Sequence, residues 1–179
     1  AAESILEFNK KLIDAVYDII PAVKPQLAYY EMYGTEGIRA FHETVRYAES
    51  KNMLVIADGK RNDIGTTAEA YSAAYLGMTQ IYGENKAAFN TDALTVNPYL
   101  GSDGIKPFIK ACEEYGKGIF ILVKTSNPSS VELQDLTLSD GRKVYEVMAG
   151  MVSKWGETTI GSFGYSSVGA VVGATWPEQ

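Results

Sequence analysis

The sequence is poor in the two residue types that most often bind transition metals or act as nucleophiles. It has one cysteine, Cys112, and one histidine, His42. A single cysteine cannot form an internal disulfide, so a reducing compartment such as the cytoplasm is expected. One histidine gives little support to a histidine-based metal site or a catalytic triad. We expect Cys112 to pack in the core and His42 to lie half-buried or at the surface of a helix.

Basic residues and long apolar runs are also scarce. The 16 lysine and arginine residues are outnumbered by 22 aspartate and glutamate residues, which gives a formal net charge of −6. This balance argues against non-specific nucleic-acid binding, although an acidic protein can still hold a small anion in a local cationic pocket. The longest apolar run, near residues 118–123, is far too short to cross a bilayer. Residues 1–10 lack the pattern of a signal peptide. We therefore expect no nucleic-acid partner and no membrane association.

Five short apolar runs alternate with five longer segments in which apolar residues recur every three or four positions. Runs that are apolar throughout are typical of parallel strands covered on both faces. The predicted strands are Ala22–Tyr30, Met53–Asp58, Ala93–Pro98, Gly118–Lys124 and Gly169–Gly173. The predicted helices are Glu3–Ile19, Glu36–Glu49, Thr67–Ile81, Ser102–Glu114 and Arg142–Lys154. The segment Thr66–Glu69 has the spacing of a capping box at a helix start. This alternation predicts βα units around a parallel sheet, in one domain that spans residues 1–179.

Two α/β architectures are built from such units, the doubly wound open sheet and the (β/α)8 TIM barrel. The sequence has no Gly-x-Gly-x-x-Gly turn and no Walker loop, which weakens the open-sheet nucleotide folds. Polar or turn-forming clusters instead follow several strands, and barrel active sites are built at the carboxyl ends of strands. These clusters are Lys24, Asp58-Gly59-Lys60, Asn97-Pro98 and Thr125-Ser126-Asn127. We expect a TIM barrel that is incomplete here, because only five of its eight strands can be counted.

The richest segment places four charged residues within six positions, directly after a predicted strand. Asp58 and Lys60 are two residues apart, so in an extended strand they share one face, and Asp63 follows three residues later. A lysine between carboxylates stays protonated. Fixed carboxylates would also repel a substrate carboxylate, and the lysine could protonate the carbanion left when carbon dioxide departs. The alternative is structural: an Asp58–Lys60 ion pair at a strand end, with Asp63 as a helix cap.

This segment closely resembles the signature of the orotidine 5′-phosphate decarboxylase family, an Asp-x-Lys-x-x-Asp followed by Ile-x-x-Thr. It is matched by Asp58, Lys60, Asp63, Ile64 and Thr67. Four further segments resemble strands of the family in the expected order, and the second of them resembles its bacterial and archaeal branch. They are Ala22–Gln26, Leu94–Gly101, Leu122–Pro128 and Val172–Glu178. The resemblance covers most of the chain, from about Val23 onward.

The resemblance implies decarboxylation of orotidine 5′-monophosphate to uridine 5′-monophosphate, a step of de novo pyrimidine biosynthesis. Lys24 would hold Asp58 and a ribose hydroxyl in place. Asp58 would face the substrate carboxylate, and Lys60 would donate the proton to C6 of the pyrimidine. The family's reaction uses neither a metal nor an organic cofactor, so none is expected.

The resemblance also implies a homodimer with shared sites. Asp63 and Thr67 would complete the pocket of the neighbouring subunit, and Ser126 would hydrogen-bond to the pyrimidine ring. Asn97 is expected to shape the floor of the pocket and contact the substrate. The family's first strand, with a ribose-contacting aspartate, would precede Ala1. Its last two strands, with the phosphate-binding groups, would follow Gln179.

Two other functions fit parts of the pattern. Magnesium-dependent sugar-phosphate decarboxylases or aldolases of the same superfamily share a similar Asp-x-Lys-x-x-Asp, but they bind the metal with a further acidic residue at the end of the preceding strand. Here Lys24 occupies that strand end, and a lysine would repel a divalent cation. A non-catalytic barrel that serves as a binding module would not need four clustered charges, which are costly to bury unless they are used.

Overall fold

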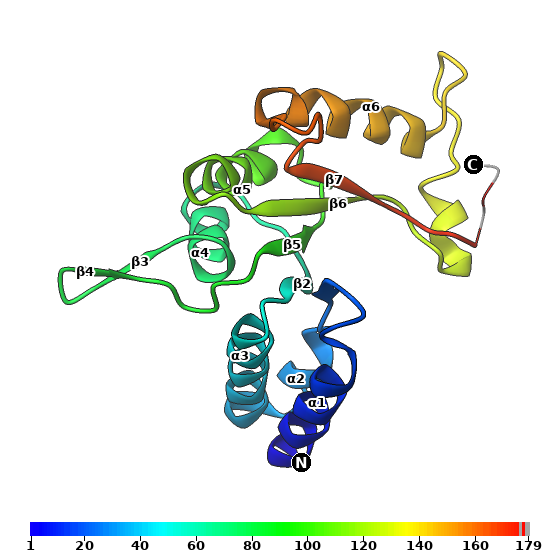
Figure 1. The fold of residues 1–179 in the computed structure, drawn as a ribbon. Helices are drawn as coiled ribbons and strands as arrows, with labels where there is room; N and C mark the ends of the chain where they lie inside the picture. Colours follow the sequence, from blue (N-terminus) through cyan, green and yellow to red (C-terminus); the bar gives the residue numbers. More distant parts are fainter. Residues whose placement is uncertain (176, 178–179) are drawn as a thin grey trace.

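The protein is built around a parallel sheet whose strands are joined by helices (Figure 1). The computed structural model describes residues 1–175 and Pro177. The strands of the main sheet are β1 (Ala22–Val23), β2 (Leu54–Arg61), β5 (Ala93–Val96), β6 (Gly118–Lys124) and β7 (Val168–Val172). The helices are α1 (Ala2–Val16), α2 (Ala28–Glu31), α3 (Gly34–Ser50), α4 (Gly65–Tyr75), α5 (Ser102–Tyr115) and α6 (Val144–Gly156), with short 3-10 turns η1 (Pro128–Glu132) and η2 (Glu157–Thr159).

The strand order identifies the architecture. In the five-stranded sheet the order is β1-β2-β5-β6-β7, and all four neighbouring pairs are parallel. The order follows the chain without reversal, whereas a doubly wound sheet reverses direction at a switch point. Sequential order of this kind is that of a (β/α)8 barrel, so the sheet is part of such a barrel. This confirms the predicted fold class.

The two faces of the sheet differ in burial. Helix α3 packs on β2, α5 packs on β6, and α6 packs on β6 and β7. Under these helices, residues such as Val55, Ile119 and Ile121 are at most 1% exposed. Ile56 and Phe120, which alternate with them, are only partly buried and line a pocket on the other face. In a barrel that face is the interior, which explains why the strands are apolar along their whole length.

An aromatic cluster forms the centre of the core between the helices and the sheet. Phe41 of α3 is fully buried, and its ring meets Tyr30 edge-on at 5.4 Å and Phe89 at 5.3 Å. Phe89 in turn stacks on Tyr75 at 5.0 Å. Edge-on and offset contacts at these separations are favourable because the positive edge of one ring meets the negative face of another. The cluster ties α2, α3 and α4 into one unit.

The predictions for Cys112 and His42, the one cysteine and the one histidine of the sequence, are confirmed. Cys112 of α5 is 2% exposed, and burial raises the pKa of its thiol to about 12. The thiol is therefore protonated and unreactive at neutral pH. His42 is half-buried on α3, beside the ring of Phe89. In the part of the chain that the structure describes, no helix is both long and apolar enough to cross a membrane.

The predicted strand Ala22–Tyr30 is much shorter in the structure. Regular strand β1 ends at Val23, and α2 begins at Ala28. Pro25 has no amide hydrogen to donate, which ends regular pairing. Its carbonyl still accepts the amide of Asp58 at 3.0 Å, and Gln26 forms an isolated parallel bridge with Asp58. The segment therefore stays beside β2 up to the residue where the charged cluster begins.

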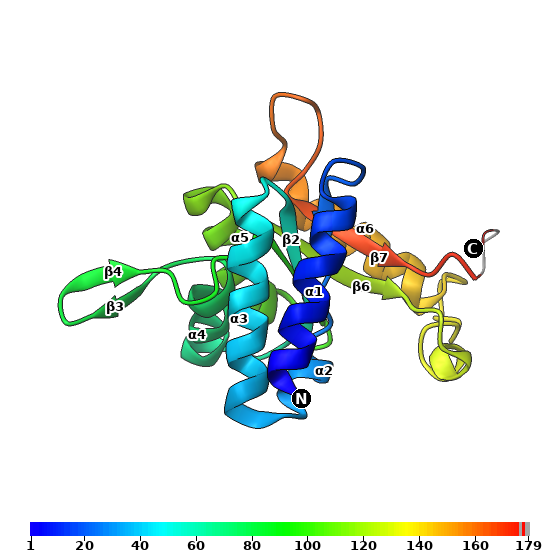
Figure 2. The same ribbon diagram turned by 60° about the horizontal axis from the view of Figure 1, so that its bottom comes forward.

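The predicted helix Thr67–Ile81 is also wrong at both ends. Helix α4 begins at Gly65 without a side-chain cap, so the capping box does not form. The helix ends at Tyr75, and strands β3 (Thr79–Ile81) and β4 (Glu84–Lys86) form an antiparallel hairpin. Tyr82 and Gly83, between these strands, both have positive φ, as a tight turn of the type I′ kind requires. The hairpin projects away from the remainder of the molecule in both views (Figures 1 and 2).

Candidate active site

The carboxylate of Asp58 is the centre of a hydrogen-bond network at the carboxyl ends of the first strands. Lys24 Nζ lies 2.6 Å from Oδ2, and Gln26 Nε2 donates to the same oxygen at 3.2 Å. Lys60 Nζ lies 2.6 Å from Oδ1, and the hydroxyl of Thr95 donates to it at 2.9 Å. Each carboxylate oxygen therefore accepts two hydrogen bonds, one of them from a lysine.

This network keeps Asp58 ionised although the residue is only 6% exposed. Burial acts to raise the pKa of Asp58, but hydrogen bonds from Lys24, Lys60 and Thr95 together outweigh it and hold the pKa below its ordinary value. A carboxylate that accepts several hydrogen bonds is stabilised in its charged form. The negative charge is thus permanent at neutral pH, and two ammonium groups flank it.

Lys60 adopts an unusual backbone conformation for a residue with a side chain. Its φ is +46°, in the left-handed region, and the pairing between β2 and β5 shifts register between Ala57 and Arg61. Non-glycine residues in this region carry strain that the surrounding structure must hold in place, and such strain is concentrated at functional sites. The bulge brings the Lys60 amine back onto Asp58, so the two predicted residues do share one site.

The charged network forms one wall of a small pocket. The pocket has a volume of about 190 Å³. The remaining lining residues are apolar: Ile56, Phe120 and Val171. A lysine–aspartate–lysine cluster beside apolar side chains is suited to a ligand that carries a charged group on an apolar body.

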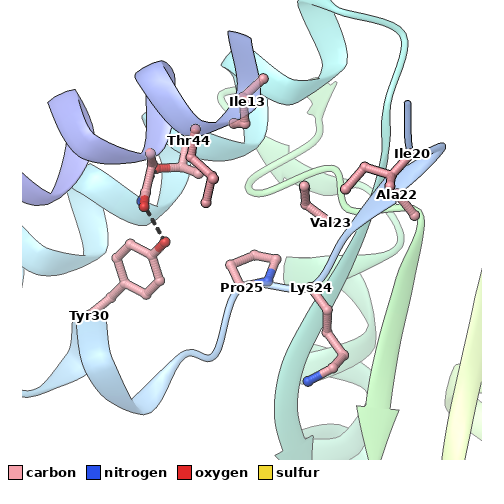
Figure 3. A pocket seen from close by; sticks show the side chains of 10 residues that line it. Ile13, Ile20, Ala22, Val23, Lys24, Pro25, Tyr30 and Thr44 are labelled. Atoms are coloured by element: carbon pink, nitrogen blue, oxygen red, sulfur yellow. Dashed lines mark hydrogen bonds between the residues drawn. The ribbon is translucent and has the colours of Figure 1, made fainter. Parts of the chain in front are cut away.

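A second pocket, of about 360 Å³, lies on the other side of the β1 segment (Figure 3). It is enclosed by α1, the residues around β1, and Tyr30 and Thr44. Asn9 donates to the Tyr30 hydroxyl at 2.8 Å and to the Thr44 hydroxyl at 3.1 Å. Lys24 contributes to its lining, but in Figure 3 its side chain extends away from Tyr30 and Thr44. The Lys24 amine is hydrogen-bonded to Asp58 instead. The charged groups Lys24, Asp58 and Lys60 therefore all line the smaller pocket.

The other two predicted residues of the charged motif do not join this network within one chain. Asp63 is half-buried, and its Oδ1 accepts the amide of Ile64 at 2.8 Å. Thr67 is exposed on the first turn of α4. Among the described residues, neither side chain hydrogen-bonds to Asp58 or Lys60. Within the described part of the chain, Lys60 therefore has one carboxylate partner, Asp58, and not the two that the sequence suggested.

Asn97 and Ser126 lie at the ends of the next two strands of the sheet. Asn97 is half-buried, and its Oδ1 accepts the amide of Tyr99 at 3.0 Å, so it shapes the turn after β5. Ser126 is exposed after β6, where the backbone of Gly173 packs against it. The Gly173 amide donates to the carbonyl of Lys124 at 2.7 Å, which joins the ends of β6 and β7. In the predicted segment Val172–Glu178, positions 176 and 178 are outside the described residues.

The side chain of Lys124, at the end of β6, is buried. The residue is 1% exposed, and its amine lies 2.7 Å from Asp135 and 3.4 Å from the Ser130 hydroxyl. The side chain of Gln134 exchanges two hydrogen bonds with Thr125, each 2.8 Å long. These contacts fasten the segment after η1 onto the end of β6. They therefore hold the turn that carries Ser126.

Two residues of the network were missed by the sequence analysis, Thr95 and Gln26. Thr95 is a polar residue within a strand whose four positions are all buried, and a buried hydroxyl needs a partner. A polar residue within an apolar run was therefore the signal from which the role of Thr95 could have been predicted. Gln26 lay in the segment predicted as a regular strand, where nothing indicated that its side chain would reach Asp58.

Arg61 is a third residue whose contacts were not predicted. Its guanidinium pairs with Glu31 of α2 and donates to the Tyr75 hydroxyl of α4 at 3.0 Å. It also lies over the rings of Tyr71 and Tyr75, about 5.5 Å from each centroid. Cation–π and ion-pair contacts of this kind stabilise partly buried arginines. Arg61 thus fastens α2 and α4 to the end of β2, next to Lys60.

A parallel βα half-barrel with a lysine–aspartate–lysine network at its strand ends defines the class of protein. The family model described as "Orotidine 5'-phosphate decarboxylase / HUMPS family" matches residues 5–179. The chain belongs to this family.

Relatives with known names agree with this assignment. The chain is 50% identical over 174 residues to orotidine 5′-phosphate decarboxylase of Caldicellulosiruptor saccharolyticus, and 45% identical to that of Rhodopirellula baltica. The match to the Caldicellulosiruptor protein covers 97% of this chain and 57% of that protein. The match to the Rhodopirellula protein covers 99% of this chain and 58% of that protein. Thus the chain spans little more than half the length of these relatives.

Solved structures show the same fold. The structure of Leishmania donovani OMP decarboxylase superposes with a TM-score of 0.81 at 34% identity, covering 98% of this chain and 62% of that one. The structure of Leishmania donovani UMP synthase gives a TM-score of 0.83, also at 34% identity. That match covers 99% of this chain and 35% of the UMP synthase chain. The described sheet therefore corresponds to part of a larger fold in both proteins.

We expect Asp135→Asn to destabilise the full-length protein by about 3 kcal/mol, because it leaves the Lys124 ammonium buried without a counter-charge. Asp140→Asn is the matched control, since it removes the partner of Arg142 in an exposed ion pair and should change stability little. Urea denaturation of both variants measures the difference. Equal midpoints and slopes for the two variants would contradict the assigned role of the Lys124–Asp135 pair.

Proposed function

We propose that the protein containing this chain decarboxylates orotidine 5′-monophosphate to uridine 5′-monophosphate, a step of de novo pyrimidine biosynthesis. The observation that carries the proposal is the Asp58 carboxylate, ionised and flanked by Lys24 and Lys60 at 2.6 Å each, on the wall of an apolar pocket. Family membership supports it, and so does the name shared by its relatives. Residues 1–179 form part of one barrel domain in this proposal.

The geometry supports a simple sequence of steps. The substrate carboxylate lies beside the fixed charge of Asp58, and the repulsion between them raises the energy of the bound ground state relative to the transition state. The bond between C6 and the carboxyl carbon breaks, its electron pair stays on C6, and carbon dioxide leaves. The Lys60 ammonium then donates a proton to C6. Lys24 holds Asp58 in place, and its charge also offsets the negative charge of the carbanion-like transition state.

The proposal includes a homodimer in which Asp63 and Thr67 complete the partner's site. Asp63 is half-buried just before α4 and Thr67 is exposed on its first turn, and among the described residues neither side chain bonds to Asp58 or Lys60 of its own chain. The assembly would then supply a second carboxylate beside Lys60, in addition to Asp58 of its own subunit. Ser126 and Asn97, at neighbouring strand ends, would contact the pyrimidine.

A metal-dependent sugar-phosphate lyase is the nearest alternative within the same family description. The amine of Lys24, at 2.6 Å from Asp58, occupies the side of the carboxylate that a divalent cation would need. Two ammonium groups beside one carboxylate disfavour cation binding, because like charges repel strongly in a partly buried site. The geometry therefore favours the reaction that uses no metal.

We expect the full-length protein to convert orotidine 5′-monophosphate with the same rate in the presence and absence of EDTA. Lys60→Ala should lower kcat at least roughly a thousandfold, because it removes both the proton donor and a charge that stabilises the transition state. The decrease in ultraviolet absorbance of the substrate follows the reaction. Lys143→Ala, at the half-buried start of α6 and outside the lining of the pocket, is the control and should be fully active.

Absence of activity in a well-folded wild-type protein would contradict the proposed reaction. In that case, turnover of a sugar phosphate that depends on magnesium would support the lyase alternative. If Lys60→Ala were as active as the wild type, this would contradict only the role of Lys60 and not the proposed reaction.

The shared site can be tested by mixing two inactive variants. In a heterodimer of Lys60→Ala and Asp63→Asn subunits, one of the two sites combines an intact Lys60 with an intact Asp63 from the partner. Random subunit exchange should therefore restore about a quarter of wild-type activity, given a two-fold symmetric dimer. A mixture of Lys60→Ala with Asp58→Asn is the control, because both residues belong to one subunit's network, and it should stay inactive. No recovery after proven exchange would contradict the shared site.

A further inference from the structure

Thr95 is the one residue that hydrogen-bonds to both Asp58 and the backbone of Lys60 among the described residues. It is 4% exposed, between Leu94 and Val96, which are fully buried. Its Oγ1 lies 2.9 Å from the Asp58 carboxylate and 2.9 Å from the Lys60 amide nitrogen. A hydroxyl in such a position is costly unless both its donor and its acceptor capacity are used.

The direction of these two hydrogen bonds is fixed by their chemistry. A backbone amide can only donate, so Oγ1 of Thr95 accepts the N–H of Lys60. The hydrogen of the Thr95 hydroxyl is then free for Oδ1 of Asp58, which as a carboxylate can only accept. The chain of donors thus runs from the Lys60 amide through Thr95 to Asp58, and its last bond is strengthened by the negative charge of the carboxylate.

We propose that Thr95 is a positioning residue that fixes the Asp58 carboxylate and the strained backbone of Lys60 relative to each other. The proposal rests on the proposed decarboxylation, and it assigns the relative placement of the two catalytic groups to one hydroxyl. The adjacent peptide is held by a second bond, from the Asn97 amide to the Arg61 carbonyl at 2.9 Å. Both bonds come from the end of β5 or the residue after it, so this strand holds the bulge of β2 in shape.

The backbone of Lys60 needs such support because of its left-handed conformation. At φ +46° a residue with a Cβ is strained, and without a partner for its amide it would relax toward an ordinary conformation. Relaxation would rotate the peptide and displace the amine from Oδ1 of Asp58. Proton transfer depends on hydrogen-bond reach between donor and acceptor, so a displacement of about 1 Å is enough to slow it.

The test compares three variants of the full-length protein. Thr95→Val replaces the hydroxyl by a methyl of similar size, and Thr95→Ser keeps the hydroxyl and removes the methyl. Thr91→Val is the matched control, because Thr91 is also fully buried and its hydroxyl donates to the Tyr75 carbonyl at 3.0 Å, before β5 begins. Thermal unfolding shows that each variant is folded at the assay temperature.

We expect Thr95→Val to lower kcat roughly 10- to 100-fold, as loss of a hydrogen bond to a charged group does, with a much smaller change in KM. The hydroxyl of Thr95 helps to keep the pKa of Asp58 low, so the acid limb of the kcat/KM profile should move to higher pH. In Thr95→Ser, kcat and the pH of the acid limb should both be near wild type. In Thr91→Val, both should be unchanged.

A carboxyl carbon NMR titration gives a readout that does not depend on activity. The Asp58 resonance, assigned with Asp58→Asn, should titrate at higher pH in Thr95→Val than in wild type, and Thr95→Ser should reverse the change. An unchanged titration and an unchanged kcat in Thr95→Val would overturn the proposal. Equal impairment of Thr95→Val and Thr95→Ser would also overturn it, because the methyl and not the hydroxyl would then matter. If wild type titrates as expected but does not decarboxylate, the proposed reaction fails and the hydrogen-bond role of Thr95 stands.

Discussion

The buried carboxylate of Asp58 is the constraint on which the site depends. A charge that is 6% exposed is tolerated because four donors surround it, and two of these are lysines. The donors come from three different strand regions, the β1 segment, β2 and β5. Any shift of one strand against another would break at least one of these hydrogen bonds, so the sheet and the network fix each other.

The fold supplies the means for this convergence. Parallel strands in sequential order bring their carboxyl ends to one edge, and the short regular part of β1 lets Lys24 and Gln26 approach Asp58 from the side. The bulge in β2 then turns the Lys60 amine back onto the carboxylate. Lys124 and Arg61 act farther out, since each fastens a neighbouring segment to the end of a strand.

The fold class and the proximity of Asp58 and Lys60 could be predicted from local patterns, although these two side chains meet through the bulge in β2 and not along an extended strand. Apolar runs and helical periodicity predict βα units, and the spacing of Asp58 and Lys60 predicts a shared face. The contributions of Thr95, Gln26 and the Lys124–Asp135 pair depend on contacts between distant segments, which no local pattern contains. The hairpin after α4 was missed for a different reason: its turn places Tyr82, a residue without turn preference, at positive φ.

In the proposed reaction, Lys60 exchanges a proton with C6 of the pyrimidine. By microscopic reversibility, a protein that protonates C6 also catalyses removal of the C6 hydrogen of uridine 5′-monophosphate. The most direct measurement is therefore loss of the C6 proton signal of this nucleotide in deuterated water, followed by NMR with wild-type and Lys60→Ala protein. We expect exchange with the wild-type protein and none above background with Lys60→Ala. Exchange at equal rates with both proteins would contradict this role of Lys60.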